Sequence, residues 1–83
     1  MNREHLYSTT DIQVATVLMC IGHHLEDVGR KGQFGRKAQA VFYFQDSEKL
    51  HSDMVAYNND EIELSPRQLF SRFRELKSQA CNI

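Results

Sequence analysis

The sequence predicts a small α+β domain whose elements follow the order α-β-β-α-α, a β-hairpin packed on three helices. Three observations predict it. Apolar residues recur at helical spacing in three segments, each of which begins with a helix-capping residue. The alternating stretch "AQAVFYF" follows a glycine-rich turn, which is typical of a hairpin. Short loops and the lack of a linker in the sequence favour a single domain over residues 1–83.

Composition favours a folded protein that does not enter membranes. The 83 residues are 41% hydrophobic and 25% charged, a balance that supports a thin core. No apolar run approaches the roughly 18 residues that span a bilayer, and "MNREHLYSTTD" has no basic-then-apolar leader. We therefore expect a cytoplasmic protein. Cys20 and Cys81 are expected to be reduced thiols, with a disulfide between them as the alternative.

The first helix is predicted to start within "TTDIQ". Thr10 as the N-cap puts Gln13 at the third helical position, which forms a capping box. Val14 and Leu18 begin an apolar stripe at helical spacing. Gly22 is expected to end the helix, because glycine readily adopts the left-handed conformation there.

The hairpin is predicted from two extended segments, near residues 24–30 and 38–45, around the turn "GRKGQFGRK". Phe42 and Phe44 alternate with Val41 and Tyr43, so the two pairs face opposite sides of the sheet. The phenylalanine side is expected to pack on the helices. Because a two-stranded hairpin is marginal alone, either "EIEL" at 61–64 adds a third strand or two copies associate.

Two further helices are predicted in the second half of the chain. One is capped by Asp46 or Ser47 and stops at Asn58-Asn59, with Leu50, Met54 and Tyr57 as its buried stripe. The last begins at "SPRQ", where Ser65 is the N-cap and Pro66 occupies the first helical position.

No catalytic or metal motif stands out in the sequence. His23 and His24 are adjacent, so on a strand they point to opposite faces; ordinary polar residues are the preferred interpretation and a metal pair is the alternative. The "GRKGQFG" glycines lie between strands rather than before a helix, which argues against a phosphate-cradling loop. We therefore expect no enzyme, no cofactor, no metal and no small-molecule substrate.

Basic residues give the best candidate for function. The net charge is −1, but acidic and basic blocks alternate along the chain. The predicted nucleic-acid-binding residues are those that could contact phosphates, with Phe34 to stack on a base: Arg30, Lys31, Phe34, Arg36, Lys37, Arg67 and Arg74. The alternative is structural, because cations at a hairpin tip protect strand edges and cations late in a helix suit its dipole.

The order of several short motifs resembles a family of short bacterial and phage proteins catalogued as a domain of unknown function. "YSTTD" is followed by an Ala-containing helix, a Gly-x-x-Leu, "FYFQD", a late Tyr and "LSPRQLFSRFRELK". The positions that carry the resemblance are Tyr7, Thr9 or Thr10, Asp11, Ala15, Gly22, Leu25, Phe42, Phe44, Asp46, Tyr57, Pro66, Phe70, Arg74, Leu76 and Lys77. The resemblance covers nearly the whole chain and implies no activity and no catalytic residues. "IGHHL" departs from the single polar residue expected after the glycine, so His24 carries no weight in it.

Together these features predict a small non-catalytic binding or regulatory module of phage or mobile-element type. Its expected partner is nucleic acid or a nucleoprotein complex. The alternative is a protein–protein module that forms a homodimer or docks through Val41, Tyr43 and an open strand edge. A variant of that alternative is a small inhibitor of a host protein complex, which would use the acidic segment 46–63 to occupy a basic site.

Overall fold

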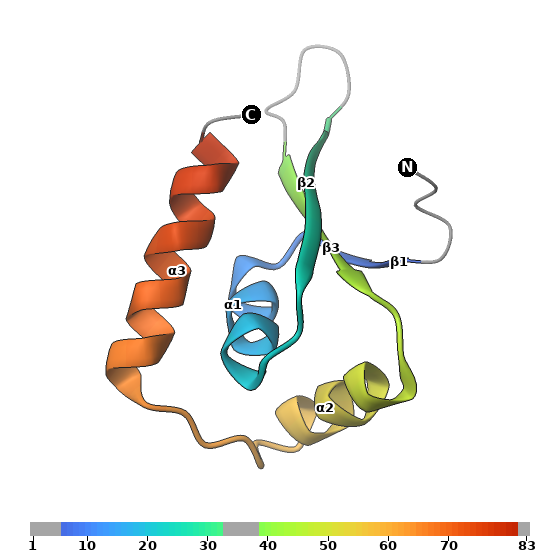
Figure 1. The fold of residues 1–83 in the computed structure, drawn as a ribbon, viewed down its shortest axis with the longest axis vertical. Coiled ribbons are helices and arrows are strands. Elements are labelled where there is room, and N and C mark those ends of the chain that lie inside the picture. The colour runs from blue at the N-terminus through green and yellow to red at the C-terminus, as the bar shows by residue number, and fades with distance from the viewer. Residues whose placement is uncertain (1–5, 33–38, 82–83) are drawn as a thin grey trace.

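Residues 6–32 and 39–81 are described by the computed structural model, and they form three helices and three strands (Figure 1). The order along the chain is β1 (Leu6–Thr9), α1 (Ile12–Ile21), β2 (Leu25–Lys31), β3 (Gln39–Gln45), α2 (Glu48–Asn58) and α3 (Pro66–Cys81). The predicted α+β class is confirmed, and the predicted order holds with one additional strand ahead of the first helix. None of the helices in these two ranges is long and apolar enough to cross a membrane.

The three strands form one antiparallel sheet in the order β1-β3-β2. β3 is therefore the central strand, with β1 paired to one edge and β2 to the other. The predicted third strand at residues 61–64 is wrong, because these residues form no strand and β1 occupies the free edge of the hairpin. Ile62 and Leu64 are half-buried and line a hollow together with Val17 and Leu69 of the helices, whereas Glu61 and Glu63 are exposed, so the alternating pattern does not require a strand.

One face of the sheet packs on the helices. Tyr7 is opposite Phe44, and Val28 is opposite Phe42, so these side chains project from the same face. Phe42 and Phe44 are buried together with Leu18 of α1, Leu50 of α2 and Leu76 of α3. The core thus takes side chains from every helix, as the alternation of "AQAVFYF" predicted.

The opposite face of the sheet carries Val41 and Tyr43. Val41 is 6% exposed and Tyr43 is half-buried. Because β1 pairs with β3, the strand that bears both residues has no open edge. The open edges of the sheet belong to β1 and β2 instead.

Local signals set the ends of the helices. The N-cap of α1 is Asp11 and not Thr10 as predicted: its Oδ1 accepts hydrogen bonds from the backbone N–H groups of Gln13 and Val14, at 2.9 and 3.4 Å. A carboxylate satisfies two N–H groups here and also complements the helix dipole, which a hydroxyl does less well. Gly22 ends α1 with φ at +117°, as predicted.

The other two helices begin where the sequence indicated. Of the two caps considered for α2, Ser47 takes that place, since its Oγ accepts a hydrogen bond from Leu50 N at 3.0 Å. α3 begins at Pro66, and Leu69 N donates to Ser65 O at 2.9 Å. Proline suits this first position because the N–H that it lacks would have no helical partner there.

Candidate nucleic-acid interface

The predicted site residues lie in three places. Arg30 and Lys31 are exposed at the end of β2. Phe34, Arg36 and Lys37 fall outside the described residues. Arg67 and Arg74 are exposed and two turns apart on α3, so they share a flank of that helix.

Arg30 and Lys31 line a hollow of about 590 Å³, which we call the basic hollow. The lining residues come from β1 and the turn after it, from β2 and from β3: Ser8, Thr9, Thr10, Arg30, Lys31, Val41 and Tyr43. The sheet order explains the combination, because β1 and β2 flank the central strand. Ser8 is opposite Tyr43 in the ladder, so both lie on the face away from Phe42 and Phe44. The basic hollow therefore lies on the face of the sheet that carries Val41 and Tyr43, although Arg30, which is opposite Ala40, projects from the other face.

The chemistry of this hollow suits an anion. Among the described residues, two cationic and four hydroxyl-bearing residues line it, and no carboxylate does. Arginine, lysine and hydroxyl side chains are the groups that most often contact phosphate oxygens in nucleic-acid complexes. Thr9 is opposite Phe42 in the ladder, so its side chain projects from the other face, where its Oγ1 accepts a hydrogen bond from Asp11 N at 3.1 Å. The acidic residue closest in register is Asp27, opposite Tyr43, and its Oδ1 accepts from Val28 N.

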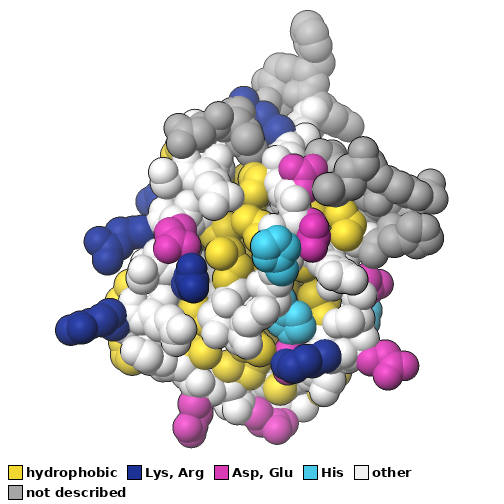
Figure 2. Space-filling model, viewed as in Figure 1, with side chains coloured by type: hydrophobic (Ala, Val, Ile, Leu, Met, Phe, Trp, Pro, Cys, Tyr) yellow, Lys and Arg dark blue, Asp and Glu magenta, His cyan; other side chains and the backbone are white. Residues whose placement is uncertain are grey.

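Arg67 and Arg74 do not join the basic hollow. They belong to α3, which packs on the other side of the sheet through Leu76, and none of the residues lining the hollow comes from a helix. Figure 2 shows Lys and Arg side chains over α3 and, apart from them, at the upper end of the molecule above β2. The predicted set is thus divided between two surfaces, and its role in binding stays a prediction.

Two histidine–carboxylate pairs lie elsewhere in the fold. His23 Nε2 is 2.6 Å from Asp53 Oδ2, which also accepts a hydrogen bond from Lys49 Nζ at 3.0 Å. His51 Nε2 is 2.6 Å from Asp46 Oδ1. The hydrogen bonds from His23 and then Lys49 hold the pKa of Asp53 below its usual value. Both pairs join segments of the chain around α2.

The described residues also show how the two adjacent histidines lie and whether a metal site exists. His24 is exposed while its neighbour His23 is half-buried, as expected for adjacent residues that point to different sides. Over the described ranges, no three His, Cys, Asp or Glu side chains come close enough together to hold a metal ion.

Both cysteines are free thiols. Cys20 is half-buried on α1, with its Sγ 3.8 Å from Gln68 O of α3, and burial raises the pKa of this thiol although Arg72 opposes the shift. Cys81 is exposed at the end of α3.

Sequence reasoning missed the hydroxyl side of the basic hollow. The sequence predicts Thr10 as a helix cap and no strand at Ser8 and Thr9, whereas the structure places Ser8 and Thr9 in a strand that borders the hollow. The usable signal was "LYST", a short stretch of β-favouring residues, but four residues alone rarely indicate a strand. The pairing of His23 with Asp53 had no local signal, because 30 residues separate them.

Comparison with known proteins agrees with the resemblance seen in the sequence. Searches of the curated proteins and of the solved structures gave no match. A family model described as a domain of unknown function, DUF5659, matches residues 4–82, which is nearly the whole chain. The protein therefore belongs to the DUF5659 family.

Proposed function

We propose that this protein is a non-catalytic module that binds single-stranded nucleic acid on the face of its sheet that carries Val41 and Tyr43. The observation that carries the proposal is the basic hollow, where Arg30 and Lys31 line the same hollow as hydroxyl-bearing residues of β1 and no carboxylate of the described residues lines it. The two cations neutralise phosphates of the backbone, and the hydroxyls of Ser8 and Thr10 donate hydrogen bonds to phosphate oxygens.

Tyr43 supports the choice of a single strand over a duplex. Its ring lines the same hollow, on the outer face of the central strand. An unpaired base can stack on an aromatic ring that a sheet presents between cations, whereas the bases of a duplex are already stacked on one another. Stacking is tolerant of sequence, so we expect little preference among bases.

Catalysis is not part of the proposal. His–Asp pairs resemble the base and orienting group of hydrolases, but such a site also needs a nucleophile within hydrogen-bond reach of the histidine. Among the described residues, the recorded side-chain partner of His23 is Asp53 and that of His51 is Asp46, and neither bonds to a serine, threonine or cysteine. The pairs are better explained as links between segments of the fold.

The test is fluorescence anisotropy with short labelled strands of mixed-sequence DNA and RNA, and with a duplex of the same length. We expect dissociation constants of about 1–100 µM that weaken steeply between about 50 and 200 mM salt. The double variant Arg30→Ala/Lys31→Ala should lower the slope of log K against log salt by about 1.4, which corresponds to two phosphate contacts on a single strand.

Matched variants distinguish binding at the basic hollow from nonspecific attraction of nucleic acid to any positive charge on the protein. Arg72→Ala removes one charge from a residue that is paired with Glu75 at 3.0 Å, and binding should stay unchanged. Tyr43→Leu should weaken binding without changing the salt slope, because it removes stacking and no charge. Absence of binding at low salt, or a loss of affinity in Arg72→Ala equal to that in Arg30→Ala/Lys31→Ala, would refute the proposal.

A further inference from the structure

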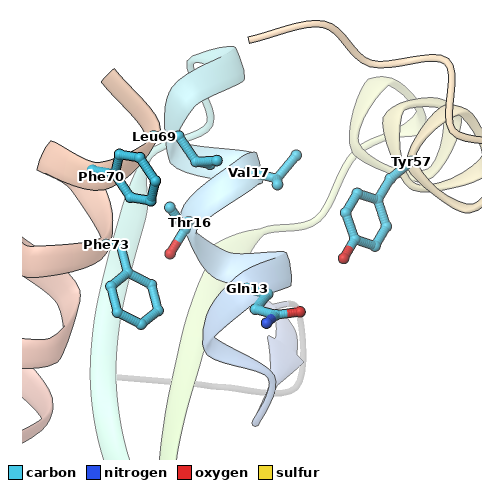
Figure 3. Close-up of a pocket in the computed structure, with 7 residues that line it drawn as sticks. All are labelled: Gln13, Thr16, Val17, Tyr57, Leu69, Phe70 and Phe73. Carbon is cyan, nitrogen blue, oxygen red and sulfur yellow. The ribbon is translucent and has the colours of Figure 1, made fainter. Parts of the chain in front are cut away.

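The helical side of the molecule carries an apolar groove. In Figure 3, Leu69, Phe70 and Phe73 of α3 lie on one side of α1 and Tyr57 of α2 lies on the other, with Val17 of α1 between them. The groove has a volume of about 450 Å³, and Gln13 and Thr16 of α1 line it as well. We call the surface that these seven residues form the helical groove.

The helical groove continues toward the segment that links α2 and α3. A second hollow of about 560 Å³ shares Val17, Tyr57 and Leu69 with it, and adds Ile62 and Leu64. The result is one apolar surface that extends from α3 to the 60–64 segment. Because such surfaces on small soluble domains usually mark contacts, an occupant is expected.

Phe70 stands out beside this groove. Its side chain is 62% exposed, and the other large hydrophobic residue exposed in the described ranges is Val55 at 59%. Phe70 lines the groove, whereas Val55 does not. An exposed aromatic next to an apolar hollow resembles a projecting anchor residue beside an unfilled pocket, the arrangement found at the centre of protein interfaces.

The rim on α3 is basic. Arg67 and Arg74 lie three residues before and four residues after Phe70, which puts them on the same flank of the helix. Lys77 Nζ lies 6.0 Å from the centre of the Phe73 ring. Arg72 pairs with Glu75, but within the part of the chain that the structure describes Arg67, Arg74 and Lys77 have no carboxylate partner.

The opposite rim is acidic. Asp60 lines the second hollow, and Glu61 and Glu63 are exposed on either side of Ile62. These three carboxylates also form no ion pair with another described residue. Figure 2 shows Asp and Glu side chains at the lower edge, where Figure 1 has the segment between α2 and α3, and Lys and Arg side chains over α3. One surface therefore carries an apolar centre, a basic edge and an acidic edge.

We propose that the helical groove is the interface of a twofold-symmetric homodimer. A twofold axis through the groove places the basic edge of each protomer against the acidic edge of its partner. Phe70 of each protomer enters the other's groove, and Arg67 and Arg74 face the partner's Glu61 and Glu63. A second copy of this chain supplies both signs of charge in the required order, whereas a uniformly acidic or basic partner satisfies one edge and is repelled by the other.

This dimer differs from the one that the sequence suggested through Val41 and Tyr43. It leaves the sheet face that carries Val41 and Tyr43 outside the interface, so each dimer presents two basic hollows. The inference rests on the charges and exposure of the helical side, and it does not depend on nucleic-acid binding.

The first test is sedimentation equilibrium over a concentration series, with Phe70→Ser compared with Val55→Ser. The two side chains are almost equally exposed, so both variants should fold as the wild type does, which circular dichroism checks. We expect a wild-type dimer, at least about tenfold weaker association of Phe70→Ser, and no change for Val55→Ser. A wild-type monomer at every concentration, or a dimer that Phe70→Ser leaves intact, would overturn the proposal.

The second test exchanges the charges across the interface. The variants Arg67→Glu/Arg74→Glu and Glu61→Lys/Glu63→Lys should each associate more weakly than the wild type, because like charges then meet. An equimolar mixture of the two should form a heterodimer, which native mass spectrometry identifies by its mass. If the mixture does not recover association, the arrangement of the two edges is wrong and another occupant, such as an acidic helix of a different protein, takes its place.

Discussion

His23 Nε2 lies 2.6 Å from Asp53 Oδ2, and this contact joins the loop that follows α1 to the middle of α2. The histidine side chain is 11% exposed and that of the aspartate 20%, so the pair is largely removed from water. Lys49 adds a second hydrogen bond from one turn earlier on α2, but its own side chain is 69% exposed. The first contact should therefore matter more for stability than the second.

Asp53→Asn should lower the free energy of unfolding at neutral pH by about 1–2 kcal/mol, because it removes a charge-assisted hydrogen bond that is largely buried. Lys49→Ala should cost about 0.5 kcal/mol or less, as exposed pairs do. Urea denaturation measures both. If the two variants lower the free energy of unfolding equally, the buried contact to His23 is not the more important one.

The same pair should give a characteristic dependence on pH. The folded state holds the pKa of Asp53 below its usual value, so the stability that this carboxylate contributes is present above the unfolded pKa and is lost as pH falls through the folded pKa. The stability difference between wild type and Asp53→Asn should therefore shrink on acidification below about pH 4. If this stability difference grows at low pH, the direction of the Asp53 pKa shift is wrong.

Capping of α1 can be tested with two adjacent residues. Asp11→Ala removes the acceptor of two backbone N–H groups and should destabilise the protein by about 1 kcal/mol. Thr10→Ala leaves the cap intact and should change stability by less than about 0.5 kcal/mol. Thermal or urea unfolding measures the stability of both variants. A larger loss in Thr10→Ala than in Asp11→Ala would mean that Thr10 is the cap.

Leu76 should be the residue of α3 on which stability depends most. Its side chain is fully buried between the helices and the sheet, so Leu76→Ala should cost about 2–5 kcal/mol, the usual penalty for a cavity in a core. Val55→Ala, at a side chain that is 59% exposed, should cost less than about 0.5 kcal/mol. Because a domain of this size is marginally stable, Leu76→Ala should be measured at low temperature with a stabilising osmolyte.

The two thiols should react at different rates. Burial raises the pKa of Cys20, so less of it is thiolate at mildly alkaline pH, and access to its half-buried sulfur is restricted. Modification by a chromogenic disulfide reagent should be biphasic, with Cys20 at least about tenfold slower than Cys81. Cys81→Ser should retain the slow phase alone, and denaturant should make the two rates similar. A fast single phase in Cys81→Ser would show that Cys20 is accessible.

Much of the fold could be predicted because its signals are local. Pro66 and Gly22 mark helix ends through the conformations that their backbones allow, and the alternation through Phe42 and Phe44 distinguishes the buried face of a strand. The sequence pointed to Thr10 as the cap of α1, but Asp11, one residue later, is an equally suitable capping residue. Here the structure selected the side chain that satisfies two N–H groups.

The candidate site was only partly predictable. Arg30 and Lys31 were identified by charge, but the hydroxyl groups that complete the basic hollow belong to a strand too short to have a clear pattern. Whether these cations form one surface with Arg67 and Arg74 depends on which side of the sheet α3 packs, and the sequence does not show this. The spacing of residues along a helix shows which side chains share a face of that helix, but it does not show where the helix lies relative to the sheet.

The sequence by itself determined the α+β class, the three helices, the hairpin and the alternation that buries the phenylalanines, because each depends on residues close together in the chain. Only the tertiary structure decided that β1 and not residues 61–64 completes the sheet, that His23 meets Asp53, and that the cations lie on two surfaces. These features depend on which distant segments pack together. That choice is made by the burial of the whole core and not by the propensity of any one segment.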